Sequence, residues 1–250
     1  MKCVNAEWEL RNLGVKTIEI SIEKSDSNFP TSKLLQTVEN FRQEYDAKYV
    51  VVRSDAKYPA ISIDFQRAGF WLMENQIGLK AVRRDLLKAF EDYKKIFYDE
   101  VSYRAASDDD IKMVCAEIEK GMFTTDRIAL DPHFGIEIAN HRYVLWLKDE
   151  LKRGALLHLT LHEGNTIGFF LDKITGEKKL AGLLGGIFKN AESQNLGAAY
   201  MYAGRIFFAD TDWKETKTAV SSNNLNILNL HLMFGHKITD IKNVLVKHFD

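Results

Sequence analysis

The chain has 250 residues, with 34 Lys and Arg against 35 Asp and Glu, and a formal net charge of −1. Hydrophobic residues make up 46% of it, which excludes a disordered chain and suffices for the core of one large domain or two modest ones. Basic and acidic residues are spread evenly, so the sequence indicates no broad basic surface for nucleic acid or membranes. This even charge is compatible with a local site for a single anionic ligand. The two cysteines, Cys3 and Cys115, predict neither a disulfide framework nor a metal site.

Targeting signals are not evident in the sequence. Residues 1–10 include Glu7 and Glu9 and lack the apolar segment of a signal peptide. No stretch reaches the roughly 18 apolar residues of a membrane-spanning helix. We therefore expect a cytoplasmic protein that does not associate with membranes.

The first hundred residues predict a short α/β series. Alternating polar and apolar residues over 16–23 indicate a half-buried strand, and Thr31 or Ser32 can begin the helix that follows. Pro59 is suited to the first turn of another helix, which Gly69 would end. The expected elements are a strand at 16–23, a helix from 31 to about 45, a strand at 49–53, a helix at 59–67, a strand at 70–82 and a helix at 84–98.

The remainder predicts a longer series. Ser107 followed by three aspartates is typical of a helix start, and Glu163-Gly164-Asn165 separates two strands as in a hairpin. The expected strands are 101–105, 155–162, 166–173, 179–188, 216–222 and 238–247, and the expected helices are 107–120, 136–152, 194–208 and 224–234.

This order predicts a mixed α/β fold with two domains, 1–98 and 99–250. Residues 61–79 and 227–245 both show a helix, a glycine turn and a strand. Chance can explain so short an echo; alternatively, the N-terminal part is a reduced copy of the same α/β unit.

The segment 180–199 carries the clearest binding signal. An apolar strand and a polar turn precede Gln194-x-x-Gly197-x-Ala199 at the start of a helix. Small residues there let main-chain N–H groups approach an anion, and the helix dipole favours negative charge. A glycine at a helix start is also ordinary turn chemistry, so this segment alone decides little.

A second motif follows about 25 residues later, with Asn224, Ile227, Leu230, His231 and Gly235 in the pattern N-x-x-ϕ-x-x-L-H-x-x-x-G, where ϕ is apolar. Together the two motifs resemble the Gcn5-related N-acetyltransferase (GNAT) superfamily over about residues 101–250. The resemblance implies a mixed central sheet whose fourth and fifth strands splay apart, and acetyl-CoA or another acyl-CoA as acyl donor.

The same resemblance implies where the donor binds. The pantetheine arm would lie along the strand before the first motif, the pyrophosphate at the helix start, and Asn224 beside the pantetheine channel. The implied cofactor residues are Leu184, Ile187, Phe188, Lys189, Gln194, Asn195, Leu196, Gly197, Ala198, Ala199 and Asn224.

Three histidines are the catalytic candidates. His231 stands where the superfamily commonly has a tyrosine that protonates the departing thiolate, so it either takes that role, as imidazolium or as a relay, or fills a helix face. An amine must be neutral to attack a thioester, and His158 and His162 on the predicted hairpin are candidate bases.

Residues 123–146 are the acceptor-site candidate, because arginine, acidic and aromatic side chains offer phosphate contacts, hydrogen bonds and ring stacking. A packed surface loop is the alternative. The residues expected to bind substrate are Arg127, Asp131, Phe134, Arg142, Tyr143 and Trp146.

The start of the chain (Glu7-Trp8-Glu9-Leu10 and Leu13-Gly14-Val15) and Arg127…Asp131-Pro132…Phe134 more loosely resemble bacterial dTDP-amino-6-deoxysugar N-acyltransferases. This resemblance implies acyl transfer to a nucleotide-linked amino sugar for surface polysaccharides, by direct attack and in a homodimer. The alternatives are another small amine or a protein N-terminus as acceptor, or a non-catalytic acyl-CoA-binding module.

Overall fold

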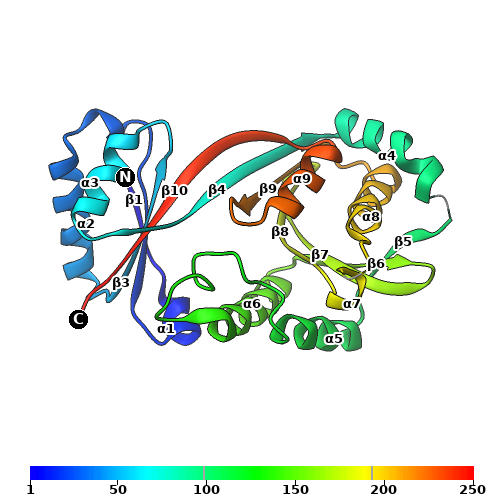
Figure 1. The fold of residues 1–250 in the computed structure, drawn as a ribbon, viewed down its shortest axis with the longest axis horizontal. Coiled ribbons are helices and arrows are strands. Elements are labelled where there is room, and N and C mark those ends of the chain that lie inside the picture. The colour runs from blue at the N-terminus through cyan, green and yellow to red at the C-terminus, as the bar shows by residue number, and fades with distance from the viewer. Residues whose placement is uncertain (98, 193) are drawn as a thin grey trace.

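The fold is known from a computed structural model that describes residues 1–97, 99–192 and 194–250 (Figure 1). In chain order its elements are β1 Lys2–Asn5, α1 Glu7–Leu13, β2 Thr17–Ser21, a 3₁₀ turn at Asp26–Asn28, α2 Thr31–Glu44, β3 Tyr49–Asp55, α3 Pro59–Arg67, β4 Trp71–Val82, α4 Arg83–Phe97, β5 Val101–Ala105, α5 Asp108–Glu119, α6 Gly135–Lys152, β6 Leu156–His162, β7 Asn165–Gly176, β8 Lys179–Ile187, α7 Lys189–Glu192, α8 Gly197–Asp210, β9 Glu215–Ser221, α9 Leu225–Met233 and β10 Lys237–His248.

One ten-stranded sheet runs through the described chain in the order β1-β2-β3-β10-β4-β9-β8-β7-β6-β5. Its strand pairs are antiparallel except for β2–β3 and β8–β9, which are parallel. The mixed α/β fold predicted from the sequence is therefore confirmed.

The two parts of the chain exchange strands at the centre of this sheet. Strand β10, from the C-terminal part, lies between β3 and β4, and β4, from the N-terminal part, lies between β10 and β9. Figure 1 shows β4 and β10 as two long neighbouring ribbons that bridge the molecule. The two predicted domains are consequently joined by continuous strand pairing, and their boundary at 98 and 99 stays a prediction.

The sequence echo corresponds to the same local unit at two places. Helix α3 leads through Gly69 into β4, and α9 leads through Gly235 into β10. Both glycines have positive φ, 87° and 97°, which a residue without Cβ adopts without strain. A Cβ at Gly235 would also lie 2.7 Å from the carbonyl oxygen of Asp85, so this turn requires glycine.

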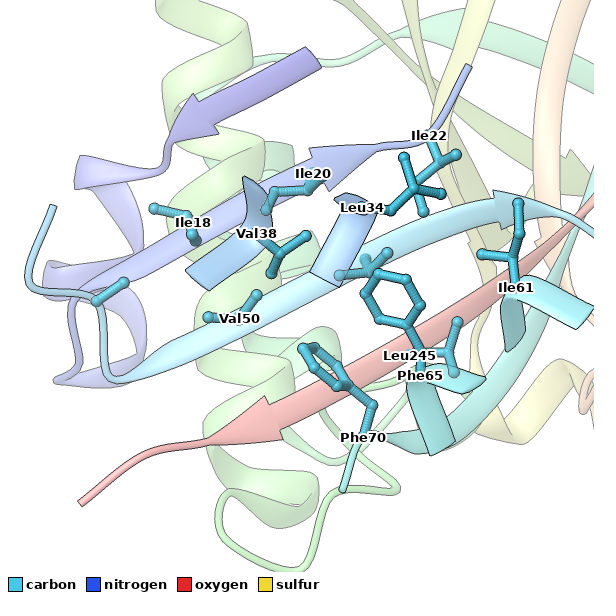
Figure 2. Packing of buried hydrophobic residues seen from close by; sticks show 12 residues of the cluster. Ile18, Ile20, Ile22, Leu34, Val38, Val50, Ile61, Phe65, Phe70 and Leu245 are labelled. Carbon is cyan, nitrogen blue, oxygen red and sulfur yellow. The ribbon is translucent and has the colours of Figure 1, made fainter. Parts of the chain in front are cut away.

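Helices cover both faces of the sheet. On one face of the N-terminal strands, α2 and α3 pack side chains such as Leu34, Val38 and Phe65 against the even-numbered Val50 and Val52 of β3 (Figure 2). The odd-numbered Tyr49 and Val51 face the opposite side, where Ile128 of the loop before α6 and Ala139 of α6 itself complete the core. Farther along the sheet, α5 and α6 cover this second face and α8 the first.

Two elements at the N-terminus were not predicted. Strand β1 extends the sheet edge beside β2, and α1 packs on α6. Their short apolar patterns give no clear period, and both depend on partners far away in the sequence. Other differences are at element ends: β8 ends at Ile187, α7 is an additional short helix, and α8 begins at Gly197 rather than 194. The predicted helix 84–98 is α4, and Tyr98 lies outside the described residues.

Within the described ranges, no helix combines the length and the apolar character needed to cross a membrane.

A buried ion pair fastens α1 to α6. The Glu9 carboxylate, which is 0% exposed, accepts hydrogen bonds from Nε of Arg142 at 2.9 Å and from Nη2 at 2.5 Å. Asn12 also donates to it, at 3.2 Å. A second pair between the same helices, Arg11–Asp149 at 2.6 Å, is much more exposed.

These two pairs allow a matched stability test. Arg142→Met leaves the buried Glu9 charge without its main partner and should lower the free energy of unfolding by about 3–5 kcal/mol in denaturant titrations. Arg11→Met makes the same chemical change at the exposed pair and should cost less than about 1 kcal/mol. Adding Glu9→Leu to Arg142→Met should recover most of the loss. Equal, small losses in both single variants would contradict the interpretation.

Candidate active site

Strands β8 and β9 diverge after only a short stretch of pairing. Their parallel register consists of Lys179–Glu215, Leu180–Thr216 and Ala181–Lys217. Strand β8 continues to pair with β7 as far as Ile187, and β9 continues to pair with β4 as far as Ser221. From Gly182 onward, β8 therefore offers unpaired backbone groups to a wedge that widens toward its C-terminal end. This is the splay that the GNAT resemblance implied.

A bulge and a glycine shape β8 beside the wedge. The register passes from Leu171–Leu184 to Asp172–Gly182, so Leu183 is an extra residue on β8. A Cβ on Gly185 would lie 2.4 Å from the Tyr200 hydroxyl of α8, so glycine there lets α8 pack closely on the strand.

Helix α8 begins close after the end of β8. The N–H groups of Gln194, Asn195 and Leu196 bond back to the carbonyls of Ala191 and Glu192. Among the predicted pyrophosphate residues, Gly197, Ala198 and Ala199 are in the first turn of α8, where N–H groups have no acceptor within the helix. The structure thus divides the predicted six-residue cradle into a tight turn and a helix start that can receive an anion.

A cavity of about 940 Å³ occupies the wedge and reaches both faces of the sheet. The α8 side is lined by His158, Phe170, Asp172, Arg205, His231 and His236. The α6 side is lined by Trp8, Glu74, Asp126, Arg142, Tyr143 and Trp146, among others.

The structure brings together only some of the predicted site residues. Leu184, Asn224, His158, His231, Arg127, Arg142, Tyr143 and Trp146 line the cavity. Phe188 and Lys189 line a separate shallow hollow beside Lys120 instead. The other predicted site residues are not among the described residues that line the cavity: Ile187, Gln194, Asn195, Leu196, Gly197, Ala198, Ala199, His162, Asp131 and Phe134. Asn224 caps α9, where its side-chain oxygen accepts a hydrogen bond from the N–H of Ile227.

His231 lines the cavity as a neutral imidazole. Burial, together with the nearby Arg205 charge, lowers its pKa to about 3. Its Nδ1 lies 3.3 Å from Nδ1 of His236. The lowered pKa disfavours an imidazolium acid at this position near neutral pH and favours a neutral relay, the other form of the role predicted from the sequence.

The two hairpin histidines are separated. His158 faces the cavity among aromatic rings, 4.7 Å from Phe207 and 5.8 Å from Tyr103 between centroids, and burial lowers its pKa. His162 lies at the end of β6, 3.7 Å from Glu100. It is not among the described residues that line the cavity, so the geometry gives no support to the predicted base role, which stays a prediction.

The arginines expected to hold a substrate phosphate are already paired. Nη2 of Arg127 donates to Glu19 at 2.6 Å, and Arg142 is held by Glu9. Both pairs join the loop and α6 to the N-terminal part of the chain, a long-range contact that no local sequence pattern indicates.

Asp131 and Phe134 are likewise committed elsewhere. The Asp131 carboxylate is 0% exposed and bonds to His248 at 2.8 Å and to the His133 ring at 3.2 Å. Phe134 packs edge-on against Tyr49, with centroids 5.1 Å apart. These residues fasten the loop to β3 and β10, so their placement does not support the substrate contacts predicted for them.

Asp172 and Arg205 are cavity residues that sequence reasoning missed. Burial raises the pKa of Asp172 to about 7, an effect that Arg205 partly opposes. Arg205 is 3% exposed, in the middle of α8. The sequence gives one indication of them: each of two apolar segments, Ile167–Asp172 and Met201–Phe208, contains a single charged residue. Nothing in the sequence showed that the two would face one cavity.

Comparison with known proteins gives a consistent result for the fold. The sequence matches no protein-family model and, at a significant level, no curated protein. Among solved structures, a functionally unknown conserved protein from Staphylococcus epidermidis matches with a TM-score of 0.64 at 10% identity, covering 94% of this chain and 85% of its own.

Two other structures carry a family name. A GCN5-related N-acetyltransferase from Sphaerobacter thermophilus has a TM-score of 0.60 at 12% identity, covering 93% of this chain and 73% of its own. A GCN5-related N-acetyltransferase from Kribbella flavida has a TM-score of 0.59 at 12% identity, covering 94% of this chain and 82% of its own. The chain therefore has the GNAT fold, as the sequence resemblance predicted.

The raised pKa of Asp172 predicts a pH-dependent cost in stability. The folded state holds this proton up to about pH 7 and the unfolded state only to about pH 3.8, so ionisation destabilises the fold increasingly between these values and by a constant amount above pH 7. Asp172→Asn removes the cost. Because the side chain is partly exposed, we expect the variant to gain about 1–2 kcal/mol over the wild type at pH 8 and nearly nothing at pH 4. A gain equal at both pH values, measured by denaturant titration, would exclude this assignment.

Proposed function

We propose that this chain is an acyl-CoA-dependent N-acyltransferase, which moves an acyl group from CoA to an amine. The observation that carries the proposal is the divergence of β8 and β9 with a cavity between them. An extended pantetheine arm can pair with the unpaired backbone of β8 as an added strand. The first turn of α8 supplies N–H groups for the pyrophosphate.

Direct attack by the amine suits the cavity. Cys115 packs in the core beneath α5, and Cys3 contacts the core of the N-terminal strands. Neither belongs to the described cavity lining, which leaves no thiol there to form an acyl-enzyme.

Asp172 is our proposed proton acceptor. Its carboxyl lines the cavity where β8 and β9 separate, and a pKa of about 7 lets it take a proton from an ammonium group near neutral pH. This role replaces the one predicted for His162.

The acceptor predicted from the sequence, a dTDP-linked amino sugar, is a narrower form of the proposal. Trp8, Tyr143 and Trp146 on the α6 side offer rings for stacking, which supports it. The pairing of Arg127 and Arg142 with glutamates weakens the phosphate contacts on which it relied. It remains a prediction for this reason, as do the homodimer and the cytoplasmic location.

Donor binding can be tested at the start of α8. Gly197→Asp places a carboxylate where the pyrophosphate would bind, so we expect acetyl-CoA affinity to fall at least about ten-fold in isothermal titration calorimetry. An acidic residue at a helix start is compatible with helix stability. A Cβ at Gly197 would lie 3.0 Å from Cδ1 of Leu230, the flexible end of a side chain that can shift, so the variant should fold. Gly176→Asp adds the same side chain at the exposed end of β7 and should bind acetyl-CoA like the wild type. Equal affinity in both variants would argue against this cofactor placement.

The role of Asp172 can be tested by the pH dependence of thiol release. The base acts only when ionised, so kcat/KM should rise with pH through an apparent pKa near 7. Asp172→Asn should lower kcat about 100-fold and remove that inflection, leaving only the rise from deprotonation of the amine itself. Asp109→Asn, on an exposed surface, is the matched control. An unchanged profile in Asp172→Asn would remove this residue from the mechanism.

A further inference from the structure

Arg205 is a buried cation that forms no hydrogen bond or ion pair with a carboxylate among the described residues. It lines the cavity, it is 3% exposed, and its Nε has no hydrogen-bond partner among the described residues. Its Nη2 makes one long contact, 3.5 Å from Nδ1 of His236. The buried Arg127 and the partly buried Arg142 are each bonded to a glutamate, at 2.6 and 2.5 Å.

An unpaired guanidinium in such a place is costly unless a ligand supplies the missing charge. Burial lowers the pKa of Arg205 to about 9, because removal from water disfavours the charged form, and the nearby Asp172 only partly opposes this effect. The neighbouring His231 and His236 are neutral and cannot supply negative charge. A carboxylate that bonds to Arg205 would remove the cost.

Asp172 supplies the opposite charge in the same cavity. No hydrogen bond or ion pair between Asp172 and Arg205 is present in the described chain, although the two charges influence each other's pKa. The cavity is thus lined by a guanidinium and a carboxyl that are not bonded to each other in the described chain. A molecule that carries both an ammonium and a carboxylate group complements this pair.

The depth of Arg205 separates this anion site from the one at the helix start. Arg205 follows Gly197 by eight residues, so it lies about 12 Å along α8. Asp172 is opposite Gly182, where a Cβ would be 3.6 Å from Oδ1 of Asp172 and 3.4 Å from Thr218. Gly182 is the first residue of β8 beyond its pairing with β9, so Asp172 lies at the narrow end of the wedge. The proposed function would bring the thioester carbon and the amine together at this end.

We propose that the acceptor is an amine with a carboxylate close to its nitrogen, as in an α-amino acid, and that Arg205 binds this carboxylate. The inference rests on the proposed N-acyltransferase function and names its substrate class. With the carboxylate on Arg205, the ammonium faces Asp172 and gives it one proton. The neutral nitrogen attacks the thioester carbon, a C–N bond forms, and the C–S bond breaks. The second amine proton goes to the departing thiolate, so the products are an amide, CoA and one proton released from Asp172.

The same guanidinium could receive a carboxylate carried by the acyl donor. Asp172 favours the acceptor, because an acidic group beside the ligand attracts an ammonium and repels a dicarboxylic acyl chain. The experiment includes both sources.

The test compares substrates that differ only in the carboxylate. Wild-type protein and acetyl-CoA are assayed with a panel of α-amino acids and the matching decarboxylated amines, such as leucine with isopentylamine and phenylalanine with phenethylamine. Nucleotide-linked amino sugars are assayed as well, because they are the acceptors predicted from the sequence. Succinyl-CoA is compared with 4-methylpentanoyl-CoA as donor, because the latter replaces the carboxylate by a branched group of similar shape.

We expect kcat/KM for at least one amino acid to exceed that for its decarboxylated partner by about 30-fold or more. Removing the carboxylate leaves Arg205 buried without its charge partner, which is costly. Arg205→Gln should remove this preference, and Arg205→Lys should retain part of it. Acetyl-CoA affinity, measured separately by calorimetry, should stay within about two-fold of wild type in both variants.

Different failures have different meanings. If acetyl-CoA does not bind the wild-type protein, the proposed function fails. If it binds but carboxylate-free amines or amino sugars are acylated equally well, only the acceptor assignment is overturned. A preference for succinyl-CoA over its isostere also overturns it, and so does an amino-acid preference that survives in Arg205→Gln. Should Arg205→Gln fail to fold, the wild-type comparison and Arg205→Lys decide.

Discussion

The pairing of β9 with β4 is the constraint on which the cavity depends. Strand β9 satisfies its backbone along seven residue pairs with β4, a strand from the other part of the chain. Strand β8 is satisfied by β7 in the same way. Because each has a complete partner on its outer side, the two strands can separate after Ala181 without losing the sheet. The exchange of β4 and β10 thus creates the opening that an acyl-CoA would fill.

The same exchange explains how the N-terminal part contributes to the site. Glu9 and Glu19 neutralise Arg142 and Arg127, which fastens the loop after α5 and the start of α6 against the first strands. The α6 wall of the cavity is thereby fixed by contacts more than a hundred residues apart in sequence. On the α8 side, Arg205 and Asp172 have no such charge partners among the described residues. The ion-paired arginines stabilise the α6 wall of the cavity, whereas the unpaired Arg205 and Asp172 of the described chain are available to bind a ligand.

Much of the fold could be predicted from local patterns. The alternation before Ser21, the Pro59 helix start, the Gly69 turn and the hairpin at Glu163–Asn165 each specify a conformation through nearby atoms. Strand β1 and α1 could not be predicted, because four and seven residues with mixed polarity are stabilised mainly by β2 and α6. Within the site, Asn224 and Leu184 were found through motif spacing. Asp131 and Phe134 have the residue types of a substrate site, but tertiary contacts with His248 and Tyr49 use them for packing.

The sequence by itself determined the mixed α/β class, the order of the main elements and the motifs of a GNAT fold. These follow from periodicity, turn residues and spacing, which act over a few residues at a time. Only the tertiary structure decided which charges are paired. Arginines 127, 142 and 205 are alike in the sequence, yet the first two meet glutamates across the exchanged sheet and the third meets neutral histidines. The even balance of charge along the chain gave no hint of this difference, because the free energy of a buried charge depends on its neighbours in space.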